Sequence, residues 1–238
     1  MKIAFFGAGG KTGAAVAARL ATAGHEVRAI EVGDEPNASG CDAAVDFTTP
    51  DAAPENVRAA LEQGVSCIVG TTGWDPAELG ALAEEKGLRL FVAPNFSIGA
   101  VLMMRFAAAA APYYESVEIV ELHHPDKADA PSGTSRRTAE LVAAARREAG
   151  LGPVPDATST GLDGARGAEI EGIHVHSVRA RGLVAHQEVL LGGPGETLTI
   201  RHDSTDRSSF TPGVLAAVRA ISGRPGLTVG LELLLDVG

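Results

Sequence analysis

The first 97 residues alternate short apolar runs with segments that are rich in helix-forming residues. Short, continuously apolar runs are typical of strands that are buried on both faces, as in a parallel sheet. The helical segments between them end at Gly24, Gly64 and Gly87, and glycine favours helix termination. This alternation predicts right-handed crossovers and a doubly wound parallel sheet. The expected strands are 3–6, 26–30, 43–47, 65–69 and 88–93, and the expected helices are 14–23, 51–63 and 75–86.

The start of the third helix carries a capping signal. Asp75 precedes a proline, which is favourable at the first helical position, and Glu78 follows three residues later. This spacing predicts that Asp75 caps the helix and that Glu78 completes a capping box.

The pattern changes after residue 97. Closely spaced strand candidates without helices between them favour an antiparallel sheet. We expect helices at 98–111, 134–149 and 211–221, a loop at 152–169, and strands at 116–122, 173–178, 183–191, 197–202 and 231–235. The predicted fold is a Rossmann-like doubly wound parallel sheet plus an α/β substrate domain with a mixed, mostly antiparallel sheet. Residues 1–96 and 208–238 would form the dinucleotide-binding domain, and residues 97–207 the substrate-binding and oligomerisation domain.

Charge and composition exclude several classes of protein. The formal net charge is −10, with 30 acidic and 20 basic residues, whereas a free-standing nucleic-acid binder is normally basic. Cys41 and Cys67 form no C-x-x-C pair and suggest no disulfide framework. The apolar stretch 98–104 stops at Arg105, and residues 1–7 are too short for a signal peptide. We therefore expect a cytoplasmic protein without nucleic-acid or membrane partners.

A glycine-rich turn joins the first expected strand to the first expected helix. Its sequence, residues 7–13, fits G-x-x-G-x-x-G better than G-x-G-x-x-G. Glycines there allow a tight turn and close approach of the backbone to a pyrophosphate, and the helix N-terminus offers free amides. Glu31 lies at the end of the second strand, where a carboxylate would accept hydrogen bonds from an adenosine ribose. The order of these features predicts nucleotide binding, and a purely structural turn is the alternative.

Two later turns follow the fourth and fifth expected strands. In open α/β sheets, ligands bind outside the carboxyl ends of the strands, where both turns would lie. Ordinary polar turns remain the alternative for each. The segments are Gly70-Thr71-Thr72-Gly73 and Ala93-Pro94-Asn95-Phe96-Ser97.

The segment 121–134 gathers residue types that carry chemistry between a strand and a helix. A histidine beside a lysine has its charged form disfavoured by repulsion, so His123 or Lys127 could donate a proton near neutral pH. The start of the following helix, with Ser132 and Thr134, could hold a carboxylate. A solvated loop before a capped helix is the alternative. A metal site is not expected, because the adjacent His123 and His124 would not easily face one ion.

In this segment and in others, the chain resembles the 4-hydroxy-tetrahydrodipicolinate reductase family of the diaminopimelate–lysine pathway. The family is also called dihydrodipicolinate reductase. The signature E-x-H-H-x-x-K-x-D-A-P-S-G-T matches residues 121–134 throughout. The glycine turn, Asp46-Phe47-Thr48, the two later turns, Ser177-Val178-Arg179, His186 and Gly195-Glu196 are also similar to the family. The resemblance covers nearly the whole chain.

The resemblance implies an enzyme that reduces a dicarboxylate heterocycle with NADH or NADPH, as a homotetramer. It implies that His123 is the general acid and base, that Lys127 is the proton donor and that His124 contacts substrate. Ser132, Gly133 and Thr134 would bind a substrate carboxylate. The implied cofactor contacts are Gly7, Ala8, Gly9, Gly10, Lys11, Thr12, Glu31, Gly70, Thr71, Thr72, Ala93, Pro94, Asn95 and Phe96.

Two departures from the family bear on the choice of cofactor. The chain is short between Glu31 and Ala43, and Val32 stands where many members have arginine. Without that arginine, Glu31 would repel a 2′-phosphate, and Lys11 offers only partial compensation. We therefore expect NADH to be preferred or equal, with NADPH still accepted.

Two other functions remain alternatives. A related NAD-dependent amino-acid dehydrogenase could share the architecture but would not need the constellation of histidines, Lys127 and Ser132-Gly133-Thr134. A non-catalytic dinucleotide sensor would keep the glycine turn but has no reason to keep Lys127.

Overall fold

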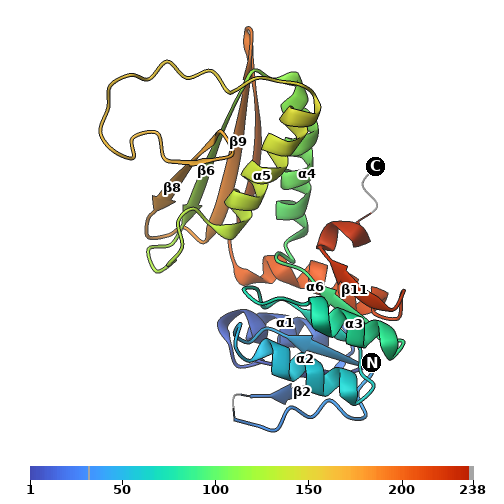
Figure 1. Cartoon of the computed structure of the whole chain (residues 1–238). Coiled ribbons are helices and arrows are strands. Elements are labelled where there is room, and N and C mark those ends of the chain that lie inside the picture. The colour runs from blue at the N-terminus through green and yellow to red at the C-terminus, as the bar shows by residue number, and fades with distance from the viewer. Residues whose placement is uncertain (32, 236–238) are drawn as a thin grey trace. The chain divides into compact units, whose positions relative to one another are not determined.

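The structure is a computed structural model that describes residues 1–31 and 33–235 (Figure 1). Contacts within the chain divide it into two compact units. Unit 1 is Met1–Ile98 together with Arg207–Gly238, and unit 2 is Gly99–Asp206. The chain therefore leaves unit 1 once and returns to it near its end.

Unit 1 is built on a six-stranded parallel sheet of order β11-β5-β4-β3-β1-β2. The order reverses between β1 and β3, so right-handed crossovers place α1 on one face of the sheet and α2 and α3 on the other. This sheet confirms the predicted Rossmann-like fold. Its strands are β1 Lys2–Phe6, β2 Glu26–Ile30, β3 Ala43–Asp46, β4 Cys67–Val69, β5 Arg89–Val92 and β11 Gly226–Val229. Its helices are α1 Lys11–Thr22, α2 Ala53–Glu62, α3 Ala77–Glu85 and α6 Thr211–Ala220.

The central strands of this sheet are buried on both faces, as their continuously apolar sequences predict. Ile3, Phe5 and Ile68 have no more than traces of exposed surface. Because the strands themselves are buried, a ligand can contact only residues in the loops at the strand ends. In open α/β sheets these are the loops that follow the carboxyl ends of the strands.

Unit 2 contains a five-stranded sheet of order β10-β9-β6-β8-β7. β6 pairs in parallel with β8, and the other three neighbouring pairs are antiparallel, so the predicted mixed, mostly antiparallel sheet is confirmed. The strands are β6 Ser116–His123, β7 Ala168–Ile170, β8 Ile173–Arg179, β9 Ala185–Gly193 and β10 Glu196–Ser204.

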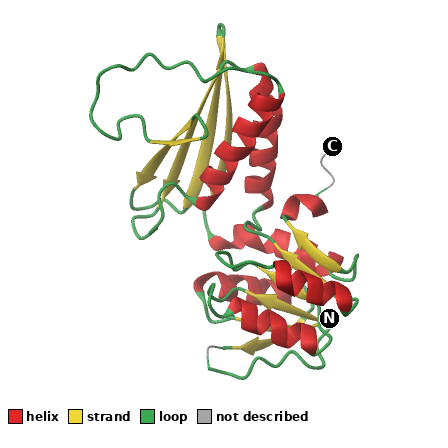
Figure 2. Ribbon diagram, in the orientation of Figure 1, coloured by secondary structure: helices red, strands yellow, loops and turns green. Residues whose placement is uncertain are grey.

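One face of this second sheet is covered by α4 (Ile98–Ala110) and α5 (Gly133–Glu148), which Figures 1 and 2 show side by side. The core between them is made of small and branched side chains, including Ala107 of α4, Ile119 of β6 and Val142 of α5. Alanines let the helices approach the sheet closely, and the β-branched residues fill the space between the strands.

The sequence prediction is wrong at three places in the fold. The expected strand 231–235 is instead the short helix η3, Leu231–Leu234, and the last strand is β11, which is bounded by Gly226 and Gly230. A leucine-rich run does not distinguish a strand from a buried turn of helix, and here only Leu231 is fully buried. The expected loop 152–169 also ends earlier than predicted, because its last two residues belong to the short strand β7, Ala168–Ile170.

The third error concerns the start of α3. Asp75 does accept the Ala77 N–H at 2.9 Å, but Glu78 pairs with Arg58 at 2.7 Å rather than completing a capping box. The helix begins one residue after Pro76, so Glu78 stands one position too early in the helix for that bond.

Candidate functional site

The glycine turn of unit 1 has the close backbone packing that a phosphate-binding turn needs. Gly7 has a left-handed φ of 80°, and its carbonyl accepts the Gly10 N–H at 3.1 Å. A Cβ atom on Gly13 would lie 2.0 Å from that same carbonyl oxygen. The turn leads into the N-terminus of α1, with Gly9, Gly10 and Lys11 exposed and Ala8 and Thr12 half-buried. The turn fits the pyrophosphate of a dinucleotide.

The carboxylate of Glu31 lies beside this turn. Its Oε1 accepts the Gly9 N–H at 2.8 Å, and its backbone N–H donates to the Asp34 carboxylate at 2.9 Å. The acid at the end of β2 and the glycine turn therefore belong to one local arrangement. Val32, on which the expected cofactor preference depends, lies outside the described residues.

The other predicted cofactor segments follow β4 and β5 at the same edge of the parallel sheet. The Gly70 N–H donates to the Asp46 carbonyl, and the Ala93 N–H donates to the Val69 carbonyl. Phe96 is buried, and its ring contacts Phe47 and Phe91. Thr71 is buried, whereas Thr72 and Pro94 are exposed and Asn95 is half-buried. The structure thus brings the predicted cofactor residues to one edge of one sheet.

The segment 121–134 of unit 2 is organised around Glu121, which has no exposed surface. Its two carboxylate oxygens each accept a hydrogen bond from Arg179, at 2.8 Å and 2.8 Å. The Glu121 carboxylate also hydrogen-bonds His123 Nδ1 and accepts the Ser132 N–H at 3.2 Å. Burial would raise the pKa of Glu121, but hydrogen bonds from His123, Arg179 and Ser177 outweigh it and lower the pKa to about 2. Glu121 is therefore a carboxylate at neutral pH.

This arrangement decides how His123 can act. With Nδ1 bonded to the Glu121 carboxylate, the imidazole is held in one orientation, and Nε2 is the nitrogen left to accept or donate a proton. A histidine oriented by a buried acid in this way is a recurrent arrangement in acid–base catalysis.

The ammonium group of Lys127 is close to the same segment. Its Nζ donates to the Asp129 carboxylate at 2.6 Å, and its backbone N–H donates to the His124 carbonyl. Burial would raise the pKa of Asp129, but the hydrogen bond from Lys127 outweighs it and lowers that pKa. The loop therefore holds Lys127 against Asp129, and half-buried His124 lies beside them in the sequence.

Ser132 caps α5 and thereby fixes the predicted carboxylate-binding residues. Its Oγ accepts the Ser135 N–H at 3.2 Å. Ser135 in turn donates to Gln187 of β9, which anchors this end of the helix in the core. Gly133 and Thr134 form the first turn of the helix, where backbone amides favour an anion.

The sequence prediction omitted two residues of this cluster, Glu121 and Arg179. Both stood in segments that resembled the family, but neither was given a role. The signal was the type of residue: a glutamate among apolar strand residues needs a buried partner. The partner lies 58 residues away, on β8, where the parallel register places Arg179 opposite His123.

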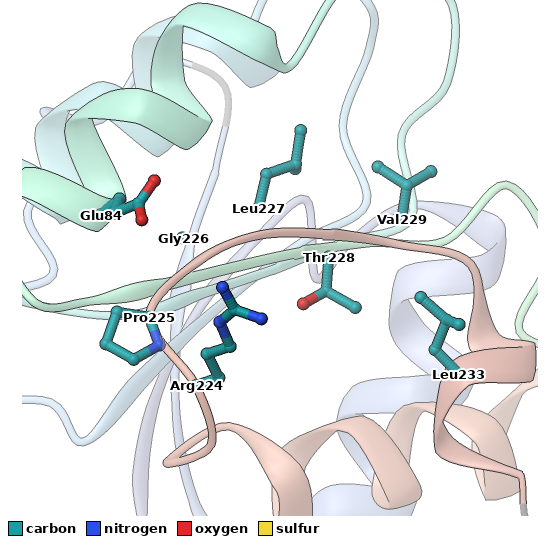
Figure 3. A pocket seen from close by; sticks show the side chains of 8 residues that line it. All are labelled: Glu84, Arg224, Pro225, Gly226, Leu227, Thr228, Val229 and Leu233. Carbon is teal, nitrogen blue, oxygen red and sulfur yellow. The ribbon is translucent and has the colours of Figure 1, made fainter.

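Three other features of the described residues were possible indications of a different function: a metal cluster, a membrane-spanning helix and a separate pocket. Among residues 1–31 and 33–235, no three His, Cys, Asp or Glu side chains are grouped to hold a metal ion, and no helix is long and apolar enough to cross a membrane. A pocket along β11 is lined by none of the predicted site residues (Figure 3). Its walls are Glu84, Arg224, Pro225, Gly226, Leu227, Thr228, Val229 and Leu233.

Family models for dihydrodipicolinate reductase match the chain along most of its length. The model "Dihydrodipicolinate reductase, N-terminus" matches residues 29–96, and "Dihydrodipicolinate reductase, C-terminus" matches residues 99–235. The chain belongs to the dihydrodipicolinate reductase family. The family and the oxidoreductase class predicted from the sequence are therefore confirmed.

Individual members of the dihydrodipicolinate reductase family are similar over the full length. The 4-hydroxy-tetrahydrodipicolinate reductase of Cutibacterium acnes is 59% identical over 100% of this chain and 99% of its own. That of Mycolicibacterium smegmatis is 55% identical over 100% of both chains. The solved structure of dipicolinate-bound dihydrodipicolinate reductase from Paenisporosarcina sp. TG-14 has a TM-score of 0.83 and 36% identity, over 99% of each chain.

More distant structures share the fold alone. The amine dehydrogenase of Mycobacterium smegmatis has a TM-score of 0.64 at 16% identity, covering 96% of this chain and 94% of its own. This likeness shows that related architectures serve other dehydrogenases. It does not favour the amino-acid dehydrogenase considered above over the reductase.

Proposed function

We propose that the chain reduces 4-hydroxy-tetrahydrodipicolinate to tetrahydrodipicolinate with a nicotinamide cofactor, in lysine and diaminopimelate biosynthesis. Family membership supports this reaction, and the observation that carries the mechanism is the Glu121 cluster, which orients His123 and the start of α5 together. In this proposal unit 1 binds the dinucleotide and unit 2 binds the substrate.

The stoichiometry of the reaction requires a proton. Replacing the 4-hydroxyl group by hydride releases water and consumes one proton, and the bound cofactor supplies the hydride. Lys127 provides an ammonium proton, and His123 can hold or deliver a proton at Nε2 while Glu121 keeps Nδ1 occupied. His124 contacts the substrate.

The substrate carries two carboxylates, and the N-terminus of α5 is suited to one of them. Backbone amides of Gly133 and Thr134 and the partial positive charge of the helix end favour an anion there, while Ser132 keeps the first turn in place. Binding at this fixed point orients the ring relative to His123, which is anchored through the same Glu121.

The experiment that tests the reaction follows NADH oxidation in the presence of the freshly made product of the preceding synthase. We expect oxidation that depends on that product. NADH oxidation with 2-oxo acids and ammonium instead would favour the dehydrogenase alternative. Binding of NADH without turnover would favour the sensor.

The cofactor proposal is that NADH is preferred or equal and that NADPH is accepted. It is supported by the carboxylates of Glu31 and Asp34 beside the turn, which repel a 2′-phosphate, and by Lys11, which offers a point charge without a bidentate bond.

Val32→Arg should therefore move the ratio of kcat/KM toward NADPH by about 5- to 30-fold, the range of a charge-assisted hydrogen bond. The measurement is kcat/KM with each cofactor in both proteins. A wild-type enzyme that favours NADPH tenfold would contradict the proposal.

We also infer a homotetramer in the cytoplasm. The tetramer is supported by the family resemblance and by β10, a nine-residue edge strand of the second sheet. Exposed sheet edges promote association unless an assembly covers them.

A further inference from the structure

Asp46 is a buried carboxylate at the carboxyl end of β3, and no role has been given to it above. Its side chain is 2% exposed. Its Oδ1 accepts the Thr48 N–H at 3.0 Å, and its Oδ2 accepts the Asn56 amide at 2.9 Å. Both oxygens are therefore acceptors of N–H groups.

Two threonine hydroxyl groups donate to the same carboxylate. Thr71 Oγ1 lies 2.6 Å from Asp46 Oδ1, the short distance of a charge-assisted O–H bond. Thr48 Oγ1 lies 2.9 Å from Oδ1 and 3.0 Å from Oδ2. A hydroxyl has one proton, and a carboxylate can only accept. Each threonine therefore donates its hydroxyl proton to Asp46, and its oxygen can otherwise only accept. The Thr48 oxygen already accepts the Asn56 amide at 3.5 Å, which leaves it one further lone pair.

The loop that carries Thr71 is also fixed by packing. A Cβ atom on Gly70 would lie 2.3 Å from the Phe47 ring, and the Phe47 ring contacts Phe96. The indole N–H of Trp74 donates to the Thr71 carbonyl at 2.9 Å. These contacts fix the backbone around Thr71, and the bond to Asp46 orients its hydroxyl.

The position of this cluster in the sheet indicates which part of a dinucleotide it would meet. Glu31 and the glycine turn stand at the ends of β2 and β1, where the adenosine ribose and pyrophosphate bind in this fold. Asp46, Thr48 and Thr71 follow β3 and β4, on the other side of β1. A dinucleotide that crosses the point where the strand order reverses places its nicotinamide half over β3 and β4.

We propose that Asp46 is a positioning residue that sets the hydroxyls of Thr48 and Thr71 as hydrogen-bond acceptors toward a donor on the nicotinamide half of the cofactor. That donor is the carboxamide N–H or a ribose hydroxyl, which share this chemistry. The inference rests on the proposed function. In this proposal Asp46 determines that the two threonine hydroxyls accept hydrogen bonds from the cofactor instead of donating them. An aspartate that only stabilised the fold would not affect this choice.

The test compares equilibrium binding of two reduced cofactors by titration calorimetry. One is NADH, and the other is its 3-acetylpyridine analogue, whose methyl ketone keeps the carbonyl but has no N–H. The proteins are wild type, Thr71→Val, Thr71→Ser, Asp46→Asn and, as a matched control on the exposed neighbour, Thr49→Val. Thermal unfolding of each variant shows that it is folded.

If the donor is the carboxamide, wild type and Thr71→Ser prefer NADH over the analogue by about 3- to 10-fold, the range of one net hydrogen bond. Thr71→Val and Asp46→Asn lose this preference, the latter because an asparagine can donate to one threonine and reverse its polarity. If the donor is a ribose hydroxyl, both variants bind both cofactors more weakly by a similar factor. Thr49→Val matches wild type in either case.

The proposal is overturned if Thr71→Val and Asp46→Asn, both folded, bind the two cofactors as wild type does. Where Asp46→Asn fails to fold, Thr71→Val alone decides the result. Failure of the proposed reaction would look different, because it would appear as missing turnover in the NADH-oxidation assay, whereas these titrations measure cofactor binding alone.

Discussion

At the scale of single residues, Lys127 is the group whose loss should be most costly to turnover. Its Nζ lies 2.6 Å from the Asp129 carboxylate, so the side chain that we propose as proton donor is held in place in the loop. Lys127→Ala should lower kcat by about 100-fold or more, the effect expected when a positioned proton donor is lost. NADH oxidation at saturating substrate measures it, with Lys86→Ala, at the C-terminal cap of α3, as a control. His123→Ala should behave similarly, and wild-type turnover in both variants would reject the assigned roles.

Glu121 should make stability depend on pH in acid. Its folded pKa of about 2 lies below the ordinary 4.5. A carboxyl whose pKa falls on folding stabilises the protein above its unfolded pKa, and that contribution is lost as the pH falls from about 4.5 toward about 2. The shift corresponds to about 3 kcal/mol. Removing the charge would also leave Arg179 without its buried partner.

Glu121→Gln should therefore reduce the free energy of unfolding at pH 6 by about 3 kcal/mol, and the difference from wild type should narrow at pH 3. Urea unfolding of both proteins at the two pH values measures this. An equal difference at both values would show that Glu121 acts through packing rather than charge.

At the scale of elements, the turn between β1 and α1 is the place with the least room for an added side-chain atom. A methyl group on Gly13 would lie 2.0 Å from the Gly7 carbonyl oxygen, so the turn must open. Gly13→Ala should cost about 1–3 kcal/mol or more in the free energy of unfolding and should weaken NADH binding. Denaturant titration and calorimetry measure the two effects. The control is Gly152→Ala, where an added Cβ meets nothing within 4 Å; comparable losses in both variants would contradict the argument.

Elements whose signals are local could be predicted from the sequence. Gly24 and Gly64 follow the ends of helices and have a left-handed φ, as their positions in the sequence predict. The apolar runs that precede the glycine turn and Thr71 are the central strands β1 and β4. The Glu121–Arg179 pair could not be predicted in this way, because it depends on the register of β6 against β8. The same applies to Asp46 and Thr71, which neighbouring parallel strands bring together. Register between distant strands is set by the whole sheet, and no short window of sequence contains it.

At the scale of the whole molecule, the expected assembly is a homotetramer. Light scattering at micromolar concentration should give four times the 24.3 kDa of one chain. The physical reason is the long β10 edge, which an assembly would cover. A mass of one chain at that concentration would count against both the tetramer and the assignment of unit 2 to oligomerisation.

The return of the chain to unit 1 also has a consequence for its synthesis on the ribosome. β5 is made early, but its outer neighbour β11 comes from residues 226–229. Translation at about 5–20 residues per second leaves the β5 edge without its partner for roughly 7–25 seconds, while the continuous unit 2 emerges in full. During that interval the edge of β5 has no partner strand, and unpaired sheet edges promote association with other chains. Moving the segment 207–235 ahead of residue 1 by circular permutation would let unit 1 close before unit 2 is made.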